Sequence, residues 1–194
     1  MILLTALAGG LIFGWGWARW HGRPYRAPEL RSTWLVLIGF VPQLLVAYLP
    51  TLHRILPDRL AAVSLSASMI LFLAFVWINR RLPGMQVLLV GLLLNLIVMA
   101  VNGGWMPISP EVASRVLGDN VQKHVNLGSR FGQKDILLPA QNMHLAFLSD
   151  RFLLPAWSPY QVAFSAGDIL IAVGAFWLMA GPPANITEPK RSSE

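Results

Sequence analysis

The sequence has no cysteine and little charge. Without cysteine the chain has no disulfide, no thiolate ligand for a metal and no thiol that could carry an acyl anchor. Charged residues are 12% of the 194 positions, about half of the roughly 25% found in soluble domains. Apolar residues, in contrast, make up 55%. Since so few charged side chains cannot cover the surface of a soluble fold of this size, an ordinary water-soluble domain is excluded.

The few charges avoid five long apolar runs, each close to the roughly 20 residues that a helix needs to cross a bilayer. The runs are Ile2–Ala18, Thr33–Leu49, Leu60–Ile78, Met85–Val101 and Val162–Ala180. Helices are expected, because an open strand in lipid leaves backbone groups unpaired. The predicted fold class is therefore an all-α integral membrane protein, with five transmembrane helices and an outer-face loop domain between the fourth and the fifth.

This prediction divides the chain into four parts. They are four transmembrane helices in residues 1–101, an extracytoplasmic loop domain in 102–161, a fifth transmembrane helix in 162–180 and a cytoplasmic tail in 181–194. The segments on the predicted inner side carry eight Lys and Arg in 34 positions, against seven in 70 on the outer side. The denser side is expected to be cytoplasmic, which places the amino terminus outside and the carboxyl terminus inside.

The pI near 10.5 follows from these basic loops, so we expect the lipid bilayer as a partner and no nucleic acid. Tryptophans are expected at the two membrane interfaces. At the inner ends of the runs are Trp15, Trp17, Trp20, Trp34, Trp77 and Trp177, and beside the outer loop are Trp105 and Trp157. Small residues recur every fourth position in the first run, at Ala6, Gly10, Gly14 and Ala18. We expect them to pack against another helix of this chain rather than to form a dimer.

The predicted outer domain is where function is expected, because it is too long for a simple connector. It opens on the turn-forming Asn102–Pro107, and a short helix is expected over Glu111–Leu117, after Ser109-Pro110.

Asp168 is the single ionisable residue inside any of the five runs, which makes it a candidate functional residue. Two interpretations compete. In the first, Ser165 and Asp168 form a capping box at the start of the last helix. In the second, the helix begins at Ser158-Pro159, and Asp168 lies about 13 Å inside it. We favour the second, in which Asp168 is functional.

Asp150, at the end of the outer loop, is the expected partner of Asp168. Two adjacent carboxyls cannot both ionise cheaply, so one keeps its proton while the other can activate water. Asp150 and Asp168 are therefore the predicted catalytic residues of an aspartyl dyad at the outer leaflet.

The stretch Leu148–Leu178 resembles the carboxyl-terminal part of lipoprotein signal peptidase (signal peptidase II), whose two catalytic aspartates have nearly the same separation. Gly91 and Asn95 also resemble a Gly-x-x-Gly-Asn segment of that family. The departures are Val98-Met99 in place of Asp-Arg, Ser165 in place of the motif Asn, and a longer loop. This resemblance implies an aspartyl peptidase or amide hydrolase acting on a membrane-anchored peptide.

A second resemblance covers the region from the fourth run to the fifth. The segments Asn102–Pro107, Lys123-His124, Leu148–Asp150 and Phe164–Ile169 look like landmarks of an uncharacterised family of small bacterial multipass membrane proteins. This resemblance implies a bacterial cytoplasmic membrane, and it implies no reaction.

Asn95, Asn102, Ser165 and His124 are the predicted supporting residues. No metal site is expected, because His124 and His144 lack the spacing and the further ligands that one needs, and no cofactor is predicted. A hydrogen bond between helices accounts equally well for Asn95. Two hypotheses stay open: a hydrolase built on the dyad, and a non-catalytic accessory subunit or binding protein that works with partner membrane proteins.

Overall fold

A computed structural model describes residues 2–48, 57–117, 126–132, 134–155, 158 and 161–181. Five long apolar helices and a small mixed region make up this part of the chain. The five long helices are α1 (Ile2–Trp20), α2 (Trp34–Tyr48), α4 (Asp58–Ile78), α5 (Met85–Val101) and α8 (Ala166–Ala180), and the mixed region contains the short helix α6 (Pro110–Leu117). The strands and 3-10 turns are β1 (Met106–Ile108), β2 (Arg130–Phe131), β3 (Asp135–Leu137), η2 (Ala140–Asn142), η3 (Ala146–Leu148), β4 (Phe152–Leu153) and β5 (Ala163–Phe164).

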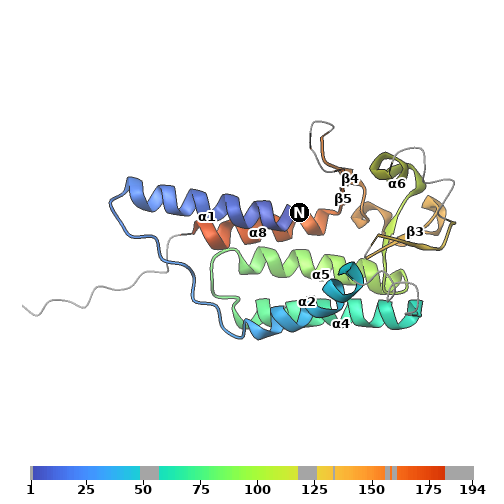
Figure 1. Ribbon diagram of the computed structural model, residues 1–194, viewed down its shortest axis with the longest axis horizontal. Helices are drawn as coiled ribbons and strands as arrows, with labels where there is room; N and C mark the ends of the chain where they lie inside the picture. Colours follow the sequence, from blue (N-terminus) through green and yellow to red (C-terminus); the bar gives the residue numbers. More distant parts are fainter. Residues whose placement is uncertain are drawn as a thin grey trace, which may run out of the picture.

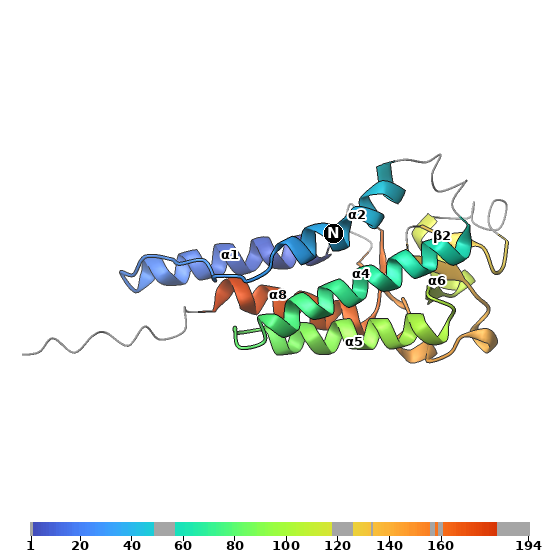
Figure 2. The same cartoon turned by 90° about the horizontal axis from the view of Figure 1, so that it is seen from below.

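The long helices lie side by side in the order α1, α8, α5, α4, α2 (Figure 1). Helix α8 packs between α1 and α5, and α4 packs between α5 and α2; α2 runs beside α4 in the second view (Figure 2). All elements between α5 and α8 gather at one end of this row, and we call residues 102–165 the cap (Figure 1). The loop after α1 and the short α4–α5 turn lie at the opposite end.

Two of the long helices, α1 with 19 residues and α4 with 21, are long and apolar enough to cross a membrane. The other three are apolar but shorter, with 15 residues in α2, 17 in α5 and 15 in α8. Of the five predicted helices, α5 has the predicted bounds. The lengths therefore support membrane association by two helices.

Glycines allow the helices to approach closely. Gly10 and Gly14 of α1 are buried against α8, so the prediction of packing within the chain is confirmed. Between α5 and α8, a Cβ on Gly91 would come within 2.6 Å of the backbone oxygen of Gly167. Because a real Cβ does not approach that closely, any larger residue would push α5 and α8 apart.

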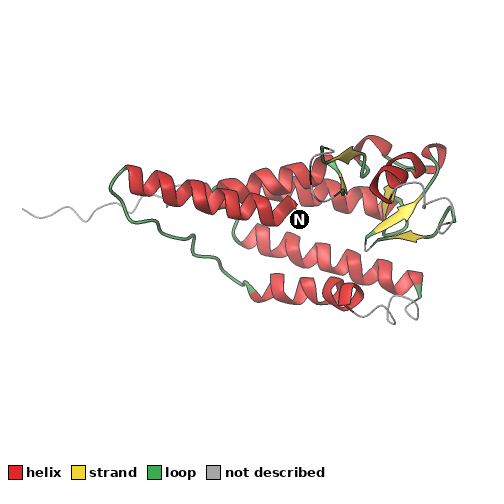
Figure 3. Cartoon of the chain, turned by 45° about the horizontal axis from the view of Figure 1, so that its top comes forward, coloured by secondary structure: helices red, strands yellow, loops and turns green. Residues whose placement is uncertain are grey.

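The prediction of an all-α fold is wrong for the cap, which contains strands (Figure 3). Strand β3 pairs in parallel with β1 and antiparallel with β2, and β4 pairs antiparallel with β5. The elements are two or three residues long, too short for a recognisable alternation of apolar and polar residues. Helix α6, by contrast, begins within one residue of the prediction, and the Ser109 hydroxyl accepts a hydrogen bond from the Val112 amide.

The last helix begins later than predicted. Ser165 is the N-cap of α8, and the preceding residues Ala163–Phe164 are extended in β5, so a helix from Ser158-Pro159 is wrong. Pairing of β5 with β4 satisfies the backbone there, which removes the reason for a helix.

The six tryptophans predicted at the inner interface are all exposed, whereas Trp105, predicted beside the outer loop, is buried. Trp15, Trp17, Trp20 and Trp34 are exposed near the end of the row opposite the cap. Trp105, which we expected at an interface, is instead 6% exposed, and the Arg130 guanidinium lies 5.0 Å from its ring centre. Trp157 lies outside the described residues.

Gly10→Ala should destabilise the protein, whereas Gly16→Ala on the same helix should not. Each change favours the helix by about 1 kcal/mol. At Gly10 the new methyl would overlap the backbone oxygen of Phe176, and at Gly16 nothing lies within 4 Å. We expect Gly10→Ala to lower the melting temperature by about 2–6 °C. Equal melting temperatures for the two variants would contradict the α1–α8 packing.

Candidate functional site

Three charged side chains meet where the cap joins helices α5 and α8. Lys134 precedes β3, Asp150 follows η3, and Asp168 lies in the first turn of α8. The Lys134 ammonium lies 2.9 Å from Oδ2 of Asp150 and 3.2 Å from Oδ2 of Asp168. The structure therefore brings the two predicted catalytic residues to one place, with a lysine between them. We call Lys134, Asp150 and Asp168 the ionic cluster.

Asp168 caps its own helix. Its backbone amide donates to the Ser165 hydroxyl at 3.0 Å, and the Ser165 amide donates to its carboxylate at 3.2 Å. This is the Ser-x-x-acid capping box, so the interpretation that we disfavoured is correct on the position of Asp168. The carboxylate also binds Lys134 and is 24% exposed, so its role extends beyond the cap of its own helix.

Asn95 of α5 holds this turn in place. The side-chain nitrogen of Asn95 donates to Oδ1 of Asp168 at 2.8 Å, and its side-chain oxygen accepts from the Ser165 hydroxyl at 2.9 Å. Asn95 and Ser165 are 3% and 0% exposed. Both hold Asp168 by hydrogen bonds, and their support of a reaction stays a prediction. The close approach of Gly91 to Gly167 brings α5 near enough for these bonds.

Asp150 is the most buried member of the cluster, with a side chain that is 0% exposed. Its backbone forms a parallel bridge with Ile108 of β1, and its amide donates to the Pro107 oxygen at 3.3 Å. The close polar neighbours of its carboxylate are the Lys134 ammonium and the Asp135 carboxyl. The ion pair with Lys134 is therefore the main compensation of a buried charge.

Burial and neighbouring charges shift the pKa values of the cluster in opposite directions. Burial by itself lowers the pKa of Lys134, but Asp150, Asp168 and Asp135 outweigh it and hold this pKa above the usual value. Burial raises the pKa of Asp150, and Lys134 only partly offsets the increase. Burial also raises the pKa of Asp135, the next residue along β3, well above its usual value. The three carboxyl groups therefore favour the ammonium form of Lys134.

The cluster differs from the predicted dyad in one chemical respect. Two carboxyls that share a proton must lie against each other, whereas here an ammonium nitrogen lies within 3.2 Å of both. An ammonium stabilises the ionised form of each carboxylate, and it opposes the protonated form that an aspartyl mechanism needs. The catalytic roles of Asp150 and Asp168 stay a prediction.

The other predicted supporting residues lie away from the cluster or outside the described residues. Asn102, at the end of α5, donates to the His144 oxygen at 2.9 Å and accepts from the His144 amide at 3.0 Å, so it fastens the cap to α5. His124 is not among the described residues. In the described part of the chain, no group of three or more acidic, His or Cys side chains could hold a metal ion.

The sequence analysis missed Lys134 and Asp135. A buried acid requires a counter-charge, and the outer loop has five basic residues that could supply it: Arg115, Lys123, Arg130, Lys134 and Arg151. Nothing in their spacing distinguishes Lys134, because the pairing of β3 with β1 decides which one reaches the aspartates.

Comparisons with known proteins give a family and no activity. A family model described as "Family of unknown function (DUF5317)" matches residues 28–180, a range that contains the whole ionic cluster. An "Uncharacterized protein" from Thermotoga maritima is 32% identical over 145 residues, covering 74% of this chain and 77% of the relative. No solved structure matches. Neither match names signal peptidase II, so that resemblance receives no support.

Lys134→Met should destabilise the fold, because Asp150 would keep a buried charge without a partner. We expect a loss of about 2–4 kcal/mol in the free energy of unfolding, less than for a fully buried pair because Lys134 and Asp168 are partly exposed. Arg115→Met, at an exposed position of α6, is the control. The double variant Lys134→Met/Asp150→Asn should recover part of the loss, and a double variant no more stable than Lys134→Met would contradict the assignment.

Acidification from pH 7 to pH 5 should stabilise the wild type more than Asp135→Asn. Because the pKa of Asp135 is raised, the folded protein keeps a proton that the unfolded chain releases above about pH 4. Its contribution to stability therefore increases as the pH falls through this window. Melting temperatures at both pH values test this, and an identical pH dependence in the two proteins would refute it.

Proposed function

We propose that this chain, which belongs to the DUF5317 family, is a five-helix protein of a bacterial cytoplasmic membrane that acts as a non-catalytic accessory or binding protein. In this proposal the ionic cluster fastens the cap to the membrane helices. The observation that carries the proposal is the position of the Lys134 ammonium between Asp150 and Asp168.

The surface of the helices supports insertion into lipid. Large apolar side chains along α1 and α2 are strongly exposed, including Ile12 at 69% and Leu37 at 69%. Such exposure would be costly in water and is ordinary in a bilayer. Helix α8, at about 22 Å, is shorter than a bilayer core of about 30 Å, a mismatch that local thinning of the bilayer accommodates.

The arrangement of the ends supports the proposed orientation. The cap lies at one end of the row, and the arginine-rich loop after α1 lies at the other with exposed tryptophans (Figure 1). With that basic end in the cytoplasm, the amino terminus and the cap are outside. The surface of the cap is then available to membrane-anchored peptides or to partner membrane proteins.

The hydrolase hypothesis is the weaker one on this geometry. It requires Lys134 to leave at least one aspartate, so that this carboxyl can take up a proton. It also asks Asp168 to react while its carboxylate receives hydrogen bonds from Asn95 and the Ser165 amide. The Asp168 carboxylate, held by these bonds, is suited to joining α8 to α5 and to the cap.

Single-cysteine labelling tests the five-helix arrangement cleanly, because the chain has no cysteine of its own. With a membrane-impermeant maleimide on intact spheroplasts, Asn126→Cys in the cap should react, and Ala27→Cys in the basic loop should react only after permeabilisation. Ile12→Cys should stay unlabelled in both cases until the protein is denatured, although this side chain is 69% exposed in the fold.

Two outcomes of the labelling experiment, and one outcome of a separate hydrolysis assay, would each overturn a part of the proposal. Fast labelling of Ile12→Cys would show that water, not lipid, surrounds α1 and would overturn membrane insertion. Labelling of Ala27→Cys in intact spheroplasts would overturn the orientation. Hydrolysis of a peptide substrate by the wild type, lost in Asp168→Asn with an unchanged melting temperature, would overturn the non-catalytic role.

A further inference from the structure

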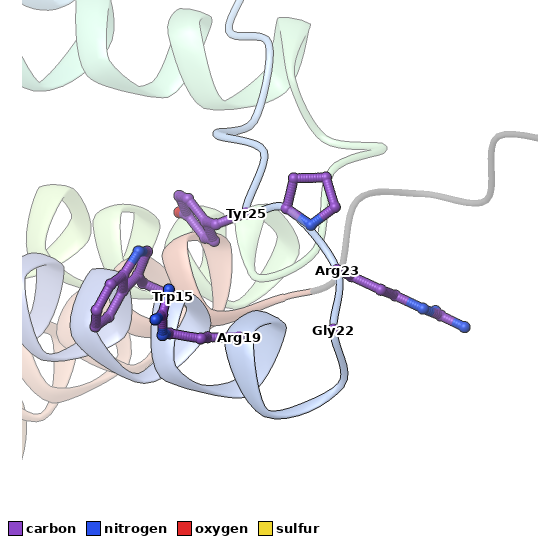
Figure 4. Close-up of a pocket in the computed structure, with 6 residues that line it drawn as sticks. Trp15, Arg19, Gly22, Arg23 and Tyr25 are labelled. Atoms are coloured by element: carbon purple, nitrogen blue, oxygen red, sulfur yellow. The ribbon is translucent and has the colours of Figure 1, made fainter.

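A hollow opens where α1 ends and the chain turns back towards α2. It has a volume of about 490 Å³ and is lined by Trp15 and Arg19 of α1 and by Gly22, Arg23, Pro24 and Tyr25 of the loop (Figure 4). The loop holds its position because the Tyr25 hydroxyl donates to the Met179 oxygen of α8 at 2.9 Å. The volume lies within the range typical of sites for small ligands.

The charged side chains that line the hollow are both arginines. The Arg19 guanidinium lies 5.9 Å from the ring centre of Trp15, and neither Arg19 nor Arg23 forms an ion pair within the described residues. In Figure 4 Arg19 lies along the Trp15 wall, while the Arg23 side chain extends outward from the rim. Guanidinium groups recognise phosphate through paired N–H donors.

The apolar surface next to the hollow continues along α1. Leu11 is 45% exposed and Ile12 69%, and both lie about one turn before Trp15 on the same side of α1. A molecule with a phosphate in the hollow could therefore lay a hydrocarbon chain along this helix. Free phosphate would use the charge alone and leave the apolar surface uncovered.

We propose that this hollow binds the phosphate headgroup of one anionic phospholipid, with Arg19 as the phosphate ligand inside the hollow, Arg23 turning inward from the rim to the same phosphate, and α1 as the support for an acyl chain. The inference rests on the membrane insertion proposed above, which places this end of α1 at the inner interface. It adds a specific lipid to that proposal, since general attraction of basic residues to the membrane would not require a shaped site.

The test compares two double variants that remove the same charge from the same end of the molecule. Arg19→Gln/Arg23→Gln alters the hollow, and Arg80→Gln/Arg81→Gln alters the α4–α5 turn. Binding of phosphatidylglycerol and phosphatidylcholine to the purified full chain is measured by native mass spectrometry. We expect the first variant to weaken phosphatidylglycerol binding about tenfold or more, since it removes both charge-assisted contacts to the phosphate. The second should weaken it less than twofold.

Further arms separate the alternatives. Arg19→Lys/Arg23→Lys should bind phosphatidylglycerol more tightly than the glutamine variant but less tightly than the wild type, because lysine keeps the charge and lacks the paired N–H donors. Phosphatidylcholine binding should be unchanged throughout. Inorganic phosphate at millimolar concentration should not displace the lipid; displacement would identify a site for free phosphate and overturn the proposal. Equal losses in the two glutamine variants, or no loss in either, would also overturn it.

Two measurements keep the result interpretable. Melting temperatures in phosphatidylcholine verify the fold. If Arg19→Gln/Arg23→Gln does not melt cooperatively, Arg19→Gln alone, with an expected fivefold loss, decides the outcome.

Failure of the lipid test while Ile12→Cys stays protected removes this inference and leaves the five-helix proposal intact. Labelling of Ile12→Cys removes both.

Discussion

The buried charge of Asp150 is the constraint on which the rest of the structure depends. Its carboxylate is fully removed from solvent, which is costly unless an opposite charge is near. Lys134 supplies that charge, and because its ammonium also reaches Asp168, one side chain links the cap to the start of α8. Together with the hydrogen bonds between Asn102 and His144, this ion pair holds the cap on the helices.

Close backbone packing makes this link geometrically feasible. Gly91 and Gly167 let α5 and α8 approach until Asn95 reaches both Ser165 and Asp168. The polar groups in the first turn of α8 are thereby satisfied across two helices, as buried polar groups must be. The same hydrogen bonds orient the Asp168 carboxylate towards Lys134, so helix packing and the ionic cluster depend on each other.

The aspartates illustrate how far inference from the sequence reached. An acid in an apolar run has to be compensated, and from this we predicted that Asp150 and Asp168 form a dyad; the structure places the Lys134 ammonium within 3.2 Å of both carboxylates. The lysine between them was not predicted, and the shared proton that a dyad requires stays a prediction. The predicted start of α8 was wrong, because the strand pairing of β4 with β5 outweighed the Ser-Pro pattern upstream.

Local chemistry alone determined helices such as α5, since the run Met85–Val101 has neither a charge nor a proline that would end it early. It also determined the capping box of Ser165 and Asp168, in which all partners lie within one turn. Only the tertiary structure decided that Lys134 is the counter-charge and that Trp105 is buried under Arg130. Those contacts join residues whose proximity depends on chain reversals within the cap, and two- and three-residue strands carry too little pattern to reveal such reversals in advance.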